Sequence, residues 1–210
     1  SGYPSAAPRD SLVFFPPRSR SATRAMRLFI LRHGKAEKDS ISGRDEDRTL
    51  ADRGHEQVRF LADSFLRASG EPFATRPERI FASGARRAVE TARIVSEMLA
   101  LPMESMKELG LGHRVSDLFD VLRVAARQNI SSLLLVGHNP QLDLAVAHLF
   151  RLAQAQGRDP LPGYAGLRTG ELVAFDIELG DAGRQFDDDD IQVHPVGSAR
   201  LAHDGPPGED

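Results

Sequence analysis

The sequence contains no cysteine and no tryptophan, and it has no long apolar run. Without cysteine, the chain cannot form a disulfide framework, a thiol nucleophile, a zinc–thiolate site or an iron–sulfur cluster. No stretch approaches the roughly 18 apolar residues that span a bilayer, so we expect no membrane partner. The apolar run at 12–15 is short, follows Arg9 and Asp10, and precedes two prolines, which makes it a poor core for a signal peptide.

The sequence also lacks an excess of either charge, although its charges are unevenly distributed. There are 27 Lys and Arg residues against 30 Asp and Glu residues, a net charge of −3 over 210 residues. Residues 1–25 are basic and residues 181–210 are acidic, which leaves the middle of the chain neutral. A neutral body gives no electrostatic support to sequence-independent nucleic-acid binding. We therefore expect no nucleic-acid partner.

Both ends of the chain lack the apolar periodicity of a folded core. Residues 1–25 are rich in Ser, Pro, Ala and Arg, as in a mitochondrial presequence, but their four prolines would break an amphipathic helix. We interpret 1–25 as a disordered N-terminal extension, 26–180 as the folded domain and 181–210 as an acidic, disordered tail. This interpretation favours a cytoplasmic protein, with organellar targeting by residues 1–25 as the alternative.

The middle of the chain alternates apolar runs with segments of helical periodicity. We expect strands at 27–31, 79–82, 132–136 and 172–179, and helices at 50–69, 85–99, 115–127 and 140–152. The wholly apolar run at 132–136 indicates a central strand, whereas the alternation within 172–179 indicates a one-sided or edge strand. The pattern predicts an α/β fold, a three-layer α/β/α sandwich with a mostly parallel sheet.

Three of the predicted strands end in residues that suit phosphate chemistry. Arg32 and His33 follow the first strand, Arg86 and Arg87 the second, and His138 the third. Ligands of open α/β sheets bind beyond the carboxyl ends of the strands, so we expect these side chains to share one rim. Guanidinium groups bind phosphate oxygens in pairs, and a neutral imidazole can attack phosphorus to form a phosphohistidine. The sequence therefore predicts phosphoryl transfer, with no metal and no other cofactor.

Three segments that carry these residues, LRHGKAE, SGARRAVETA and VGHNP, resemble the motifs of the histidine phosphatase superfamily, which has the phosphoglycerate mutase-like fold. The segment DRTLADRG at 47–54 resembles the loop-to-helix entry of its SixA-type phosphohistidine phosphatase branch. The resemblance covers about residues 26–179. It implies that His33 is the phosphorylated nucleophile, that Arg32 and Arg87 bind the phosphate, and that His138 binds and polarises the phosphoryl group.

The resemblance leaves the proton donor less defined. Larger relatives use an acidic residue for this role, and Glu108 is the candidate here, although the SixA branch often lacks a counterpart. Gly84 stands where many relatives have proline, and Glu90 where glutamine is common, and neither touches the expected chemistry. Three further arginines are interpreted as surface charges or as members of loop salt bridges: Arg44, Arg48 and Arg86.

The predicted function is a metal-independent phosphatase that acts through phospho-His33. Its expected partner is a phosphorylated substrate, namely phosphohistidine or another phosphoprotein, because little sequence between the motifs is available to form a lid over a small molecule. Two alternatives are a small-molecule phosphomonoesterase of the same superfamily and a non-catalytic phosphate-binding module. A metal hydrolase is less favoured, because two arginines would repel a dication and no His-Glu-x-x-His pattern exists. The sequence does not predict the oligomeric state.

Overall fold

Six strands of the computed structural model, which describes residues 24–180 and 191–202, form one sheet in the order β3-β2-β4-β1-β5-β6. Strands β1, β2, β3 and β4 run parallel, β5 is antiparallel to β1, and β6 is antiparallel to β5. Their bounds are β1 (Arg24–Arg32), β2 (Arg79–Ala82), β3 (Met103–Ser105), β4 (Ser132–Gly137), β5 (Glu171–Leu179) and β6 (Ile191–Arg200). The sheet is therefore mostly parallel, as predicted.

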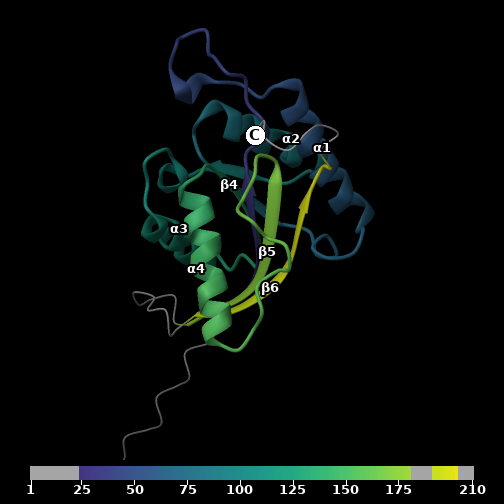
Figure 1. Ribbon diagram of the computed structural model, residues 1–210, viewed down its shortest axis with the longest axis vertical. Coiled ribbons are helices and arrows are strands. Elements are labelled where there is room, and N and C mark those ends of the chain that lie inside the picture. The colour runs from purple at the N-terminus through teal and green to yellow at the C-terminus, as the bar shows by residue number, and fades with distance from the viewer. Residues whose placement is uncertain (1–23, 181–190, 203–210) are drawn as a thin grey trace, which may run out of the picture.

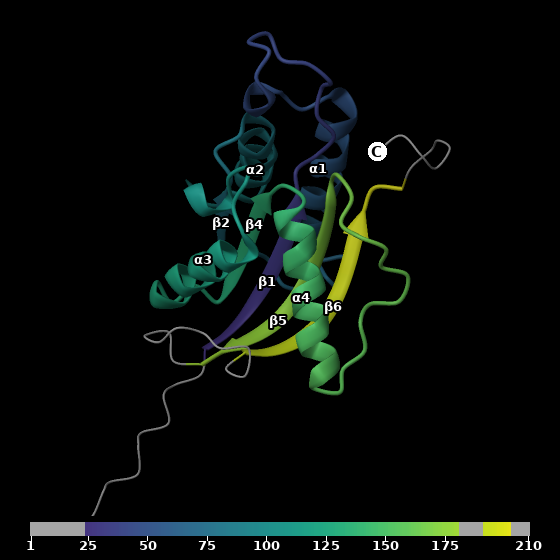
Figure 2. The same cartoon turned by 60° about the vertical axis from the view of Figure 1, so that its left-hand side comes forward.

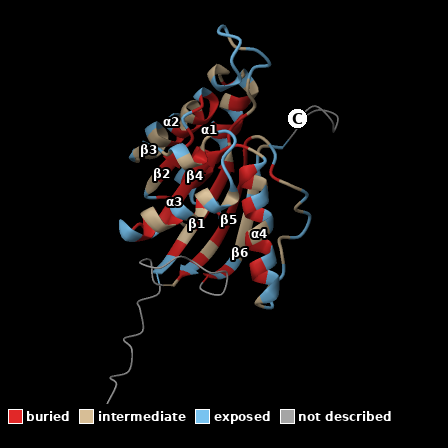
Figure 3. Ribbon diagram, turned by 90° about the vertical axis from the view of Figure 1, so that its left-hand side faces the viewer, coloured by how far each residue is buried: buried red, intermediate tan, exposed pale blue. Residues whose placement is uncertain are grey.

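In the part of the chain that the structure describes, four α-helices cover the two faces of this sheet (Figures 1 and 2). They are α1 (Asp52–Arg67), α2 (Arg86–Leu99), α3 (Val115–Arg127) and α4 (Gln141–Ala155). Side chains of β1 alternate between the faces: Phe29 and Leu31 pack in the core with α1 and α2, whereas Leu28 and Ile30 pack with α3 and α4. Burial of Leu28–Leu31 of β1 (Figure 3), with side chains in both cores, explains the continuous apolar run at 28–31 and confirms the three-layer sandwich.

The structure corrects three expectations about the strands. β1 begins at Arg24, before the predicted domain boundary at residue 26. β5 lies inside the sheet, hydrogen-bonded to β1 on one side and to β6 on the other, so it is not an edge strand. β6 lies within the predicted acidic tail, and its Pro195 and Gly197 concealed it because both residues are depleted in strands. The rest of the predicted extension and tail, 1–23, 181–190 and 203–210, lies outside the described residues.

The carboxyl ends of β1, β2 and β4 meet at one end of the sheet, where segment 34–49 rises above them (Figure 1). Its base is closed by a bridge between Ala36 and Leu50 and by a hydrogen bond of 2.9 Å from the Glu37 N–H to the Thr49 carbonyl oxygen. Towards its C-terminal end, segment 34–49 contains the short 3-10 helix η1 (Asp45–Asp47). Within the described ranges, no helix has both the length and the apolar character needed to cross a membrane.

The chain packs tightly where it leaves β1. A Cβ on Gly54 in the first turn of α1 would lie 2.1 Å from the carbonyl oxygen of Lys35, and a Cβ on Gly34 would lie 2.7 Å from the carbonyl oxygen of Gly54. Neither position has room for a methyl group, because the obstructing atoms belong to the backbone. This contact fixes the start of α1 against the residues that follow His33.

Replacing Gly54 by alanine is therefore expected to destabilise the fold by about 1–3 kcal/mol, the usual cost of overpacking. The sign of this change in stability is informative, because helix propensity alone would make the alanine variant more stable by about 1 kcal/mol. Urea unfolding would measure the change, with Gly84→Ala as the control, since a Cβ there would lie 3.5 Å from the nearest atom, Ser105 Oγ. Equal stabilities of the two variants would contradict the close approach.

Candidate active site

His33 follows β1 and is 7% exposed. Its Nδ1 lies 2.7 Å from the carbonyl oxygen of Gly34. A carbonyl oxygen only accepts hydrogen bonds, so Nδ1 carries the proton. In the neutral ring Nε2 then holds a lone pair, and this atom accepts a hydrogen bond of 3.1 Å from Nε of Arg87. The local geometry thus selects Nε2 as the nucleophilic atom.

His33 is kept neutral by its surroundings. Burial of the ring is the main cause that lowers the pKa of His33 to about 4, against the opposing effect of the hydrogen bond to Gly34. The positive charges of Arg87, Arg32 and Arg48 lower this pKa further. At neutral pH the ring is unprotonated, as a nitrogen nucleophile must be.

Arg87 stands in the first turn of α2 and is 4% exposed. Besides the Nε contact with His33, its Nη1 donates to the backbone carbonyl of Asp45 at 2.6 Å and its Nη2 donates to Asp45 Oδ2 at 2.8 Å. The Ser83–Ala85 turn between β2 and α2 sets this position, because it starts α2 next to the carboxyl ends of the parallel strands. The guanidinium therefore lies directly beside the Nε2 atom of His33.

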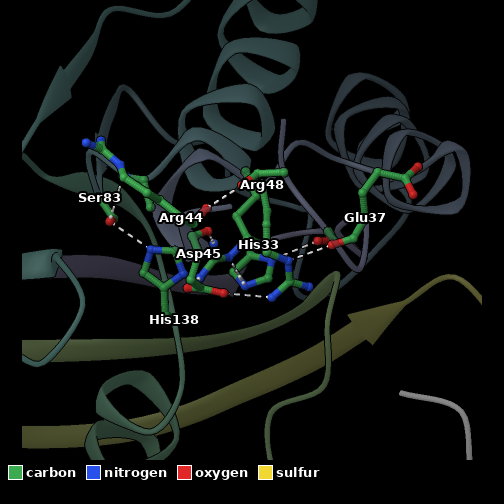
Figure 4. Close-up of polar contacts among 11 residues, drawn as sticks. His33, Glu37, Arg44, Asp45, Arg48, Ser83 and His138 are labelled. Carbon is green, nitrogen blue, oxygen red and sulfur yellow. Dashed lines mark hydrogen bonds and ion pairs between the residues drawn. The ribbon is translucent and has the colours of Figure 1, made fainter. Parts of the chain in front are cut away.

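His138 follows β4 on the other side of the site and is 3% exposed. Its ring centroid lies 5.0 Å from that of His33, with the two planes at 54°. Nε2 of His138 lies 2.8 Å from Oγ of Ser83 (Figure 4), whereas the buried Nδ1 has no hydrogen-bond partner among the described residues. Burial, followed by Coulombic repulsion from the protonated form of His33 and from Arg87, lowers the pKa of His138 to about 3, so this ring is also neutral at neutral pH.

A cavity of about 620 Å³ joins these residues. Its lining includes five cationic side chains and one carboxylate: Arg32, Lys35, Lys38, Arg48, Arg87 and Asp45. Arg32 is held by a hydrogen bond of 3.1 Å from Nη1 to the carbonyl oxygen of Leu167. Cationic groups around two neutral imidazoles form a site that can bind a multiply charged anion next to a nucleophile. The structure thus brings together the four residues that the sequence selected.

Arg48 forms a salt bridge within its loop, with Asp45, which is one of the two roles expected from the sequence, but it is not a surface charge away from the site. It lines the cavity, where its Nε donates to the Glu37 carbonyl at 2.6 Å and its Nη1 donates to Asp45 Oδ1 at 2.8 Å. The available signal was the short spacing from Asp45 to Arg48, which keeps both side chains on one turn. Arg44 and Arg86 are exposed and do not line this cavity, as expected of surface charges.

Glu108 lies outside the lining of this cavity. It belongs to the 3-10 helix η2 (Lys107–Leu109), where its backbone carbonyl accepts a hydrogen bond of 2.7 Å from Gln141, and its side chain does not line the cavity. Among the described residues that line the cavity, the acidic side chain is Asp45. The geometry gives no support to Glu108 as a proton donor.

Comparisons with known proteins agree with this geometry. A model of the histidine phosphatase superfamily (branch 1) matches residues 28–110. A phosphohistidine phosphatase SixA homolog of Haemophilus influenzae is 31% identical over 133 residues, which cover 60% of this chain and 77% of the relative. The matched part of the family model includes the Arg32–His33 and Arg87 segments.

Solved structures show the same relationship. A crystal structure from Agrobacterium tumefaciens, assigned as the phosphohistidine phosphatase SixA, is 28% identical with a TM-score of 0.55, covering 72% of this chain and 91% of that one. A protein histidine phosphatase SixA in complex with tungstate shares the fold at 24% identity and a TM-score of 0.60, covering 81% and 96%. The chain belongs to the histidine phosphatase superfamily, in its SixA-type branch, and is a phosphatase.

Proposed function

We propose that this phosphatase removes phosphate from phosphohistidine on a protein, without a metal ion, through a phosphorylated His33. One observation carries the proposal: the lone pair of a neutral His33 lies at Nε2, 3.1 Å from the Nε–H of a buried arginine. A phosphoryl group brought to Nε2 would meet the guanidinium that can bind its oxygens. The name of the Haemophilus influenzae relative and the fold shared with a tungstate-bound SixA support the same function.

The reaction proceeds in two displacements. First, Nε2 of His33 attacks the phosphorus of a phosphohistidine whose other ring nitrogen carries a proton; the bond from phosphorus to the leaving nitrogen breaks, and its electron pair stays on that nitrogen, so the leaving group departs as neutral imidazole. Then water attacks phosphorus, the bond to Nε2 breaks with its electron pair returning to His33, and a proton is released to solvent. Arg32, Arg87 and Arg48 offset the charge on the equatorial oxygens in both steps, and His138 binds the same group.

The charge state of Asp45 favours phosphohistidine over an alkyl phosphate. Hydrogen bonds from Arg48 and Arg87 lower the pKa of this carboxyl below its usual value, so it is ionised at neutral pH and has no proton to donate. An alkoxide leaving group needs such a proton far more than an imidazole does. A site whose lining acid is ionised therefore suits a nitrogen leaving group.

The surroundings of the cavity favour a macromolecular substrate. Between β2 and β4 the described chain forms only α2, β3, η2 and α3, which leaves no separate capping domain over the site. A second depression of about 1030 Å³, lined by residues of segment 34–49 and by Arg86, shares Lys38 with the cavity. A protein loop that presents a phosphorylated side chain can lie across both.

A substrate panel tests this function. We expect kcat/KM for a phosphohistidine peptide to exceed that for a phosphoserine peptide or a sugar phosphate by about 10²–10⁴-fold, the usual contribution of a general acid that the alkyl esters lack here. An aryl phosphate, with its better leaving group, should fall between them, and a chelator should leave all rates unchanged. Fastest turnover of the sugar phosphate would favour the small-molecule alternative, and phosphate binding without turnover would favour the binding module.

A further inference from the structure

A carboxylate from the protein itself occupies the anion position of the site. Oδ2 of Asp45 accepts a hydrogen bond of 2.8 Å from Nη2 of Arg87, and its Oδ1 accepts one of 2.8 Å from Nη1 of Arg48. With the backbone carbonyl of Asp45 on Nη1, every nitrogen of the Arg87 guanidinium has a partner. A phosphoryl group on Nε2 of His33 would approach the same guanidinium groups, where its negative charge and that of the Asp45 carboxylate repel each other.

Asp45 lies in segment 34–49, which rises above the sheet (Figure 1). Internal contacts hold this segment together: Ser40 Oγ donates to the Arg44 carbonyl at 2.7 Å, and Ser42 Oγ donates to Asp47 Oδ2 at 2.6 Å. The Asp45 side chain is 53% exposed, whereas that of Arg87 is 5% exposed. Asp45 can therefore leave towards solvent while Arg87 stays fixed on α2.

We propose that Asp45 is a built-in competitor for the phosphate site, which a phosphoryl ligand must displace from Arg87 and Arg48. The inference rests on the proposed function, because it takes Arg87 to be a phosphate ligand. The carboxylate acts as a specificity determinant: a phosphoryl dianion with three oxygens exchanges for it favourably, whereas a weaker anion does not. Return of Asp45 to the arginines after hydrolysis also helps to expel the phosphate product.

Calorimetric titration with inorganic phosphate at pH 7.5 tests the proposal without measuring turnover. The Asp45→Asn variant keeps the shape of the side chain and removes its charge, which weakens its hydrogen bonds with the arginines. If the carboxylate holds the site closed about nine-tenths of the time, this variant binds phosphate about tenfold more tightly than the wild type. Asp45→Ala should show the same or a larger increase.

Asp47→Asn is the matched control. Asp47 lies in the same short helix, and its substitution removes the same charge. Its partners are Ser42 and Arg44, so phosphate affinity should not change. Weaker binding by both Asp45 variants would overturn the proposal, because it would mean that Asp45 supports the arginines. Unchanged binding would overturn it as well, while leaving the proposed function in place. Absence of phosphate binding by all the proteins, including the wild type, would overturn the proposed function together with this inference.

Discussion

His33→Ala is expected to lower kcat by about 10⁴-fold or more with every substrate, the scale seen when a covalent nucleophile is removed. The reason is geometric: the hydrogen bond to Gly34 leaves the free electron pair on Nε2, beside the guanidinium of Arg87. Steady-state hydrolysis of an aryl phosphate and of a phosphohistidine peptide measures the loss. Rapid quenching under alkaline conditions, followed by peptide mapping, should place an acid-labile phosphoryl group on residue 33.

His113→Ala is the control for this experiment. The His113 ring is exposed, pairs with Asp117 at 3.0 Å and does not line the cavity, so its loss should leave the rate within about twofold. Label on another histidine of the wild-type protein, above all on His138, whose Nδ1 has no hydrogen-bond partner among the described residues, would refute the assignment. So would substantial turnover by His33→Ala.

Arg87→Lys is expected to lower kcat/KM by about 10²–10³-fold, although the charge is kept. Arg87 uses three different nitrogens at once, on His33 Nε2 and on two oxygen atoms of Asp45. A lysine ammonium is a single point donor and cannot reproduce this fork. Arg86→Lys is the matched control, since Arg86 is the preceding residue, is exposed and pairs with Glu90. Equal effects of the two substitutions would refute a specific role for Arg87.

Arg87→Ala adds a pH signature that a merely structural role would not produce. The Arg87 charge is one of the causes that lower the pKa of His33 to about 4. Without this charge the protonated ring is less disfavoured, so the His33 pKa should rise towards its ordinary value of about 6.5. The pH below which protonation of His33 lowers the rate then moves upward. An NMR titration of the His33 ring in the two proteins checks the direction, and an unchanged or lower pKa would contradict it.

Much of the fold follows from local patterns in the sequence. The apolar run of β4 and the helical periodicity of α1, α2 and α3 are properties of neighbouring residues, and those elements lie where the patterns place them. The convergence of His33, Arg87 and His138 could also be predicted from the sequence. Each follows a parallel strand, and a general rule of open sheets brings such strand ends together.

Tertiary contacts decided the rest. The sequence of β6 disfavours a strand, and it forms one because β5 offers an open edge for pairing; the same pairing makes β5 an interior strand. Arg48 and Asp45 enter the site, and Glu108 does not, because segment 34–49 folds back over the sheet while η2 packs against Gln141. The sequence by itself determined which side chains can perform phosphoryl chemistry, since their identity and their strand-end positions are local. Only the tertiary structure decided which charges surround them, because that depends on where distant loops come to rest.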